Sequence, residues 1–146
     1  MTIQRDMAVR PHKRSKLWEK LLSVVEDIYY MTDALPKQEV YGLTLQMRRA
    51  AVSIASNIAE GAARRGKQEK AQFYSIARGS LSELDAQMEI AARLKFIKTG
   101  QYDEMQLRLA EVSRMLQGLI NAYADSWITY GSISDVSITD VLITDY

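Results

Sequence analysis

The sequence contains no cysteine and only two prolines. Without cysteine, the 146-residue chain can form no disulfide, no thiolate nucleophile and no zinc–thiolate or iron–sulfur site. The absence suits a reducing compartment, and we expect a cytoplasmic protein. Because only Pro11 and Pro36 restrict the backbone, long stretches between and after them are free to be helical.

Histidine is almost absent as well, since His12 is the only one. A di-iron helical bundle needs Glu-x-x-His motifs on two helices, which a single histidine cannot supply. The lack of a second histidine also argues against histidine-dependent triads and zinc-hydroxide sites. The segment 61–68 contains Gly66-Lys67, but Gln68 stands where a phosphate-binding loop has Ser or Thr, and the segment follows a predicted helix instead of a strand. We therefore predict no catalytic residue, no metal site, no cofactor and no enzymatic activity.

Long apolar runs are missing too. No stretch of about 18 apolar residues could form a membrane-spanning helix, and residues 1–16 lack the apolar centre of a signal peptide. Hydrophobic residues make up 47% of the chain, which is enough for one domain with a core. We expect one globular domain with no membrane association.

Positive charge is absent from the C-terminal part. Residues 125–146 contain four Asp and no Lys or Arg, whereas residues 1–124 contain 19 bases against 14 acids, a net charge of +5. A basic body of this kind could contact nucleic acid. The alternative is an ordinary solvated surface of mixed charge.

Four stretches show apolar residues at helical spacing, near residues 16–32, 38–63, 68–96 and 101–127. Ser15 is a suitable N-cap for the first. The last has an unbroken seam at alternating spacings of three and four, formed by Tyr102, Met105, Leu109, Val112, Leu116, Leu119 and Tyr123. Short connections between such helices predict an all-α fold, an up-and-down antiparallel four-helix bundle.

The termini differ from this central region. We predict a basic, flexible arm over residues 1–15, the bundle over 16–127 and an acidic tail over 128–146. The tail repeats one pattern three times at a period of five, as Ile133-Ser134-Asp135, Ile138-Thr139-Asp140 and Ile143-Thr144-Asp145. Five matches neither helix nor strand periodicity, so we predict a flexible tail; an added strand on a partner's sheet edge is the alternative.

The second predicted helix has two apolar faces. A surface helix needs only one, so the second predicts a contact with another subunit. The predicted oligomer interface consists of Tyr41, Leu45, Val52 and Ala59.

Basic residues are concentrated within about thirty positions around the second and third helices. The predicted nucleic-acid-binding residues are Arg48, Arg49, Arg64, Arg65, Lys67 and Lys70, assisted by Arg10, Lys13 and Arg14 of the arm. No aromatic residue interleaves with Arg64, Arg65 and Lys67, so binding should use phosphates and show weak sequence preference. The alternative is that Arg64 pairs with Glu60 and the other side chains cover apolar surface.

Three segments resemble the four-helix-bundle family encoded in intervening sequences of bacterial 23S ribosomal RNA genes. They are YGLTLQMRRAAVSIASNIAEG at 41–61, LPKQE at 35–39 and IARGSLSEL at 76–84. The resemblance extends over residues 16–125; Ala55 stands where the family often has proline, and the tail matches nothing in the family.

The resemblance implies a left-handed antiparallel bundle that assembles as a homopentamer. It also implies kinship with the accessory variability proteins of diversity-generating retroelements, which bind a reverse transcriptase and nucleic acid.

Two functions remain open. One is a non-catalytic nucleic-acid-binding adaptor for RNA or DNA, serving a ribonucleoprotein or a reverse transcriptase. The other is a protein-interaction scaffold that binds no nucleic acid.

Overall fold

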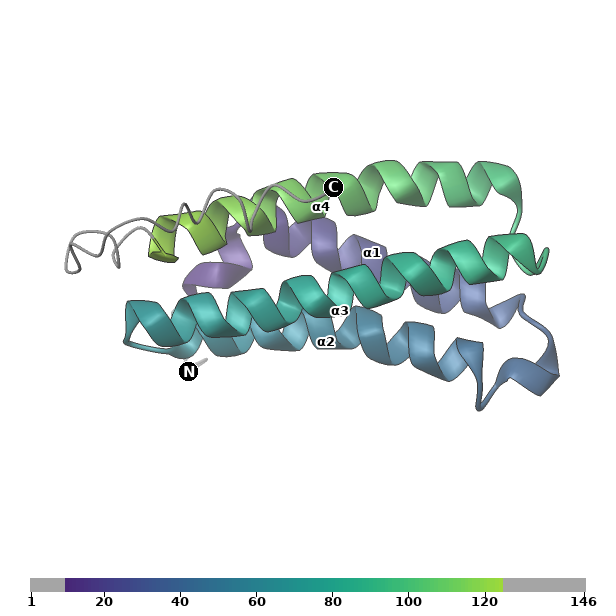
Figure 1. The fold of residues 1–146 in the computed structure, drawn as a ribbon, viewed down its shortest axis with the longest axis horizontal. Coiled ribbons are helices and arrows are strands. Elements are labelled where there is room, and N and C mark those ends of the chain that lie inside the picture. The colour runs from purple at the N-terminus through teal and green to yellow at the C-terminus, as the bar shows by residue number, and fades with distance from the viewer. Residues whose placement is uncertain (1–9, 125–146) are drawn as a thin grey trace, which may run out of the picture.

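The computed structural model describes residues 10–124, and within this range every regular element is helical. Two short 3-10 helices accompany four long α-helices (Figure 1). The elements are η1 (Pro11–Arg14), α1 (Lys16–Asp33), η2 (Lys37–Glu39), α2 (Leu43–Ala63), α3 (Lys67–Arg93) and α4 (Thr99–Ala124). Successive helices run in opposite directions, and each packs on its two neighbours around the bundle, α4 closing on α1. The predicted four-helix bundle is confirmed.

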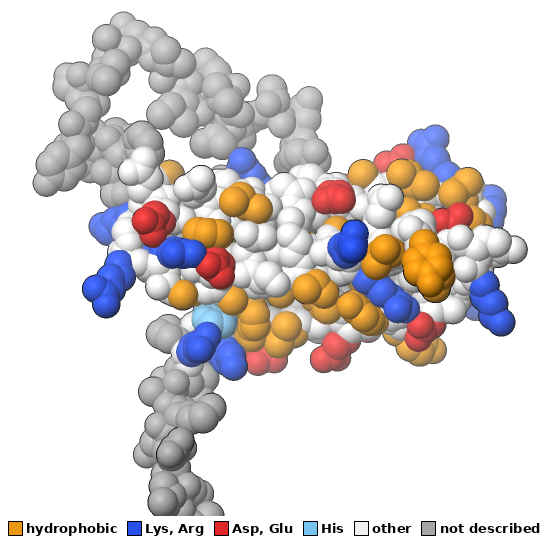
Figure 2. All heavy atoms as spheres, turned by 90° about the horizontal axis from the view of Figure 1, so that it is seen from below, with side chains coloured by type: hydrophobic (Ala, Val, Ile, Leu, Met, Phe, Trp, Pro, Cys, Tyr) orange, Lys and Arg blue, Asp and Glu red, His pale blue; other side chains and the backbone are white. Residues whose placement is uncertain are grey.

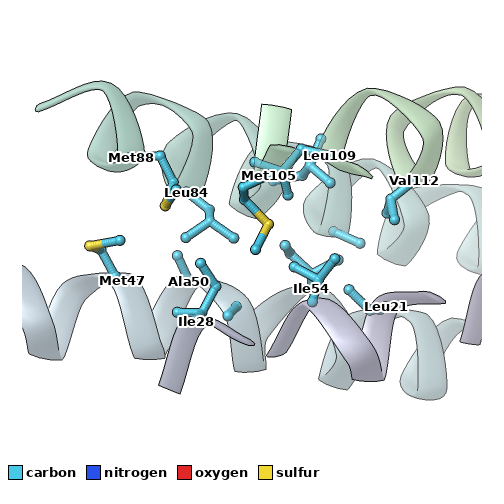
Figure 3. Packing of buried hydrophobic residues seen from close by; sticks show 14 of the residues in the cluster. Leu21, Ile28, Met47, Ala50, Ile54, Leu84, Met88, Met105, Leu109 and Val112 are labelled. Atoms are coloured by element: carbon cyan, nitrogen blue, oxygen red, sulfur yellow. The ribbon is translucent and has the colours of Figure 1, made fainter. Parts of the chain in front are cut away.

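The core is formed by the apolar stripe of each helix. Figure 3 shows side chains of all four helices pointing toward one another along the bundle axis. The largest fully buried side chains are Leu21, Val24, Ile28, Met47, Ile54, Leu84, Met88, Val112 and Leu116. Burying such aliphatic side chains contributes about 1.5–3 kcal/mol each, so these stripes determine which faces of the helices meet.

The α2–α3 pair is the most closely packed. Gly61 makes the approach possible, because a Cβ atom there would lie 2.8 Å from the Tyr74 ring. The hydroxyls of Ser53 and Ser80 join the two helices at 2.8 Å. Polar contacts join the α1–α4 pair in addition to the shared core: Lys20 pairs with Glu111 at 2.8 Å.

The helix ends agree with the sequence only in part. Ser15 caps α1 as predicted, accepting a hydrogen bond from the Trp18 amide at 3.1 Å. The second helix begins at Leu43, five residues later than predicted, because Gly42 has a non-helical backbone and the Glu39 carboxylate accepts the Leu43 amide at 3.0 Å. Tyr41 therefore lies in the turn before α2 and not on its face.

The third helix ends at Arg93, three residues earlier than predicted. Lys95 has a φ of 64°, a left-handed conformation that no α-helix continues through. The fourth helix is described to Ala124, so the prediction that it continues to 127 lies outside the described residues, as do most of the predicted arm and the whole tail. No helix among residues 10–124 is long and apolar enough to cross a membrane.

Candidate nucleic-acid interface

The six predicted nucleic-acid-binding residues do not form one cluster. Arg48 and Arg49 lie in the first half of α2, whereas Arg64, Arg65 and Lys67 surround the turn between α2 and α3. About fifteen helical residues separate the two groups, which corresponds to more than 20 Å along the bundle. The structure therefore divides the predicted site into a lateral part and an end part.

Arg48 is a structural residue that joins α2 to the end of α1. Its Nε donates to Thr32 Oγ1 at 2.8 Å, and its terminal nitrogen donates to the Tyr29 carbonyl at 3.3 Å and pairs with Asp33 at 2.8 Å. The guanidinium also lies 4.7 Å from the centre of the Tyr29 ring. Since α1 has no basic residue in its own last turn, Arg48 supplies the positive charge that a helix C-terminus favours.

Arg64 and Lys70 are engaged at the end of α2. Arg64 pairs with Glu60 and lies 4.9 Å from the Phe73 ring centre, so the predicted alternative pairing of Arg64 with Glu60 is confirmed. Lys70 donates to the Ala62 carbonyl at 3.0 Å and to the Gly61 carbonyl at 3.4 Å. Both side chains therefore stabilise the end of α2, and their polar groups already have partners within the protein.

The other three cations are exposed. Among the described residues, Arg49, Arg65 and Lys67 make no side-chain hydrogen bond or ion pair. Arg65 and Lys67 flank Gly66 in the α2–α3 turn, where the chain leaves one helix and enters the next.

The N-terminal segment brings further cations to the same end. Figure 1 places η1 at the same end of the bundle as the α2–α3 turn, and η1 contacts both α1 and α2. Arg10 and Lys13 are exposed there, and Figure 2 shows Lys and Arg side chains around the single histidine. We call the four exposed cations Arg10, Lys13, Arg65 and Lys67 the basic end. The predicted Arg14 also lies in η1.

His12 lies next to these cations with its ring 4.7 Å from Trp18 in an edge-on arrangement. Burial lowers the pKa of His12, and the charges of Lys13 and Arg10 lower it further. His12 is therefore mainly neutral at pH 7, and the positive charge of this end comes from Lys and Arg.

Three of the four predicted interface residues, Leu45, Val52 and Ala59, form a partly exposed apolar stripe on α2. Val52 is 41% exposed, Leu45 and Ala59 are half-buried, and Tyr41 is 88% exposed in the preceding turn. An open groove of about 520 Å³ lies along this stripe, lined by Tyr29, Leu45, Arg48, Arg49, Val52 and Ser53. In Figure 2, which views the side on which α2 lies, hydrophobic side chains are spread along this face.

Some exposed apolar residues of this region were not predicted from the sequence. Tyr29 of α1 lines the groove. In the sequence it lies off the buried apolar face of α1, and this position could have indicated an exposed aromatic residue. On α3, Ile76 and Ile90 are also about half exposed. Each has a polar residue before it and an alanine after it, and the sequence showed no second apolar stripe along α3 from which to predict their exposure.

Carboxylates on α3 do not form a separate site. Glu83 accepts from Gln87, Asp85 accepts from Gln106 at 2.7 Å, and Glu89 pairs with Arg93 at 3.0 Å. In the part of the chain that the structure describes, no group of His, Cys, Asp and Glu could hold a metal ion.

Comparison with known proteins decides the family. The profile of the 23S rRNA-intervening sequence proteins matches residues 13–118, which include all of α1, α2 and α3 and most of α4. The chain belongs to this family. The resemblance seen in residues 41–61 is thereby confirmed.

A solved structure supports the same fold. A protein of unknown function from the S23 ribosomal protein family of Bacteroides thetaiotaomicron VPI-5482 is similar with a TM-score of 0.66 and 22% sequence identity. The match covers 71% of this chain and 97% of that one. A search of curated proteins finds no match. At this identity the similarity shows the fold alone, so neither comparison assigns a role to the basic end.

Proposed function

We propose that this member of the 23S rRNA-intervening sequence family is a non-catalytic, oligomeric adaptor that binds nucleic-acid phosphates at its basic end. The observation that supports this most directly is that Arg65 and Lys67 are exposed without partners among the described residues, at the end of the bundle where η1 also lies with the exposed Arg10 and Lys13. Long cationic side chains in this arrangement can contact successive phosphates.

Assembly would strengthen such binding. In an oligomer, which the resemblance suggests is a pentamer, each subunit contributes one basic end, and linked sites bind a polyanion far more tightly than one site does. The apolar stripe of α2 is the proposed interface between subunits. The helix ends already engage three of the predicted cations, Arg48, Arg64 and Lys70. The proposed phosphate-binding residues are therefore Arg10, Lys13, Arg65 and Lys67.

The test is a titration of labelled single-stranded RNA and DNA of equal length with the parent and with Arg65→Ala/Lys67→Ala. We expect the double variant to bind at least tenfold more weakly, with a shallower dependence of affinity on salt, because each lost phosphate contact lowers the slope by about 0.7 for single strands. The matched control is Lys95→Ala/Lys98→Ala, which removes two exposed cations at the opposite end of the bundle.

Two results would contradict the proposal. One is no binding by the parent at low salt, and the other is an equal loss of affinity in the control variant. Unchanged circular dichroism of both variants establishes that the fold is intact.

The groove on α2 favours the second candidate, a protein-interaction scaffold. Tyr29, Leu45 and Val52 offer apolar contacts and Arg49 one exposed charge, a composition typical of protein recognition surfaces. Binding of a protein partner, such as a reverse transcriptase, through this surface should change little with salt. Salt dependence therefore distinguishes the two functions.

A further inference from the structure

The chain contains an acidic segment that is complementary to its own basic end. Residues 125–146 contain four aspartates and no Lys or Arg, whereas the rest of the chain has a net charge of +5. Three of these aspartates recur in equivalent settings, each after Ile and Ser or Thr.

The described part of α4 ends on the same side of the molecule as the basic end. Figure 1 shows α4 ending at the same end of the bundle as the α2–α3 turn. The side chains agree, because the Tyr123 ring lies 5.7 Å from the Tyr74 ring and 5.8 Å from Lys70 Nζ, both of α3. Ala124, the last described residue, thus lies near the start of α3, the helix that Lys67 begins.

We propose that residues 125–146 dock on the basic end of their own chain through Asp135, Asp140 and Asp145, and that they compete there with nucleic-acid phosphates. The competition rests on the proposed function, whereas the docking itself does not. The occupant of this surface in the absence of nucleic acid is therefore the chain's own tail.

Reach favours this end over the other. The 11 residues from 125 to 135 can span at most about 40 Å, so Asp135 reaches the basic end with much slack. The opposite end, which carries Lys95 and Lys98, is about 40 Å away along the 27 residues of α3. A tethered group acts at high effective concentration only within its easy reach, so the near end is preferred.

The strength of the contact suits a reversible competitor. Exposed ion pairs contribute little individually and weaken with salt. Three equivalent aspartates can replace one another on the same cations, which keeps one bound without fixing the tail in one arrangement. A nucleic acid with many phosphates across several subunits can then displace the tail.

The docking is tested without nucleic acid by carbodiimide cross-linking of the full chain at low salt, followed by mass spectrometry. The reagent joins a carboxylate and a lysine amine that are in contact. We expect links from the tail aspartates to near-end lysines, and fewer of them in 0.5 M salt. The near-end lysines are Lys13, Lys16, Lys67 and Lys70.

Other cross-linking outcomes overturn the docking. These are an absence of tail links at low salt, or links mainly to the opposite-end residues Lys37, Lys95 and Lys98. An equal mixture of unlabelled and nitrogen-15-labelled protein tests whether the tail belongs to the same chain. Mixed-isotope pairs as the main product would assign the tail to a neighbouring subunit and contradict the proposal.

The competition is tested with Asp135→Asn/Asp140→Asn/Asp145→Asn. At low salt we expect this variant to bind single-stranded RNA or DNA about three- to tenfold more tightly than the parent, a difference that disappears as salt is added. The matched control is Glu26→Gln/Asp103→Asn/Glu104→Gln, which neutralises three exposed carboxylates away from the basic end.

An equal gain in nucleic-acid affinity in both variants would show that net charge alone explains the effect, and it would overturn the proposed competition. If neither the parent nor the Asn variant binds nucleic acid, the proposed function fails, and the competition fails with it. The cross-linking result would still establish or refute the docking on its own.

Discussion

Lys95 is held in a backbone conformation that its side chain disfavours. Its φ is 64°, and the chain closes α3 there with two hydrogen bonds: the Lys95 amide donates to Ala92 at 3.1 Å and the Phe96 amide to Ala91 at 2.9 Å. This is the pattern of a Schellman motif, in which glycine usually occupies the left-handed position. A Cβ atom is costly in this region because it crowds the backbone.

We therefore expect Lys95→Gly to raise the free energy of unfolding by about 0.5–1 kcal/mol, the gain from the relieved strain exceeding the entropy that glycine adds to the unfolded chain. Urea denaturation measures it. Lys95→Ala keeps the Cβ atom and removes the charge, so it should show no such gain; an equal gain in both variants would attribute the effect to charge.

Gly61 has the opposite requirement, since it needs space and not an unusual φ. An added methyl group would lie 2.8 Å from Tyr74 Cε1 and 3.1 Å from Phe73 Cβ. We expect Gly61→Ala to lower the free energy of unfolding by about 1–3 kcal/mol, because α3 must move away from α2.

Gly79 is the matched control for Gly61, because it lies in the interior of α3 with open space around it. The same substitution, Gly79→Ala, should be stabilising by about 0.5–1 kcal/mol through helix propensity alone. Thermal unfolding followed by circular dichroism compares the two. A stabilised Gly61→Ala variant would show that the α2–α3 spacing is not fixed by this residue.

At the scale of the elements, α1 depends on α2 for its C-terminal end. Arg48 donates to Thr32 and to the Tyr29 carbonyl and pairs with Asp33, so one side chain of α2 binds three groups of the last turn of α1. Truncation should leave these groups without a charged partner. We expect Arg48→Ala to lower the free energy of unfolding by about 1–2 kcal/mol.

The neighbouring Arg49 provides the control, because it is exposed and makes no side-chain hydrogen bond or ion pair within residues 10–124. Arg49→Ala should change the free energy of unfolding by less than about 0.5 kcal/mol. Arg48→Lys should restore only part of the loss, since one ammonium cannot reproduce the fork of a guanidinium. Chemical denaturation of the three variants measures the order of their free energies of unfolding. Equal stabilities of the two alanine variants would contradict the role given to Arg48.

The elements also show how far the sequence could be interpreted. The stripes that predicted four helices are the buried faces, because a period of 3.6 residues must place them against one another. In α4, the predicted seam is buried from Met105 to Leu116, but Ile120 then replaces Leu119. A straight helix turns slightly away from a strict heptad, so the seam moves by one residue over its length.

The site was less predictable than the fold for a physical reason. A sequence shows that a residue is cationic but not which acceptor it will meet, and the acceptors of Arg48 lie 15 to 19 residues away on another helix. Lys70 likewise binds carbonyls of α2 that are ordinary backbone until the helix ends there. Only packing separates these supporting cations from the exposed Arg65 and Lys67.

At the scale of the whole molecule, the apolar stripe of α2 is a surface that remains partly exposed in a single bundle. Val52 lies at its centre beside the groove formed with Tyr29 and Leu45. Burying this stripe against a second subunit should contribute several kcal/mol, at about 25 cal/mol per Å² of apolar surface, before the cost of association. We expect the parent to have a mass several times the 16.6 kDa of one chain at micromolar concentration.

Val52→Glu places a charge at the centre of this surface and should shift the mass measured by light scattering toward that of a single chain, because an unpaired charge is costly to bury. Leu107→Glu is the control, since Leu107 is 75% exposed on α4, which does not border the groove. A monomeric parent, or equal dissociation of both variants, would remove α2 as the interface. Where Val52→Glu does dissociate the assembly, its nucleic-acid affinity should fall as well, although every cation of the basic end is intact, because one basic end then acts without its copies.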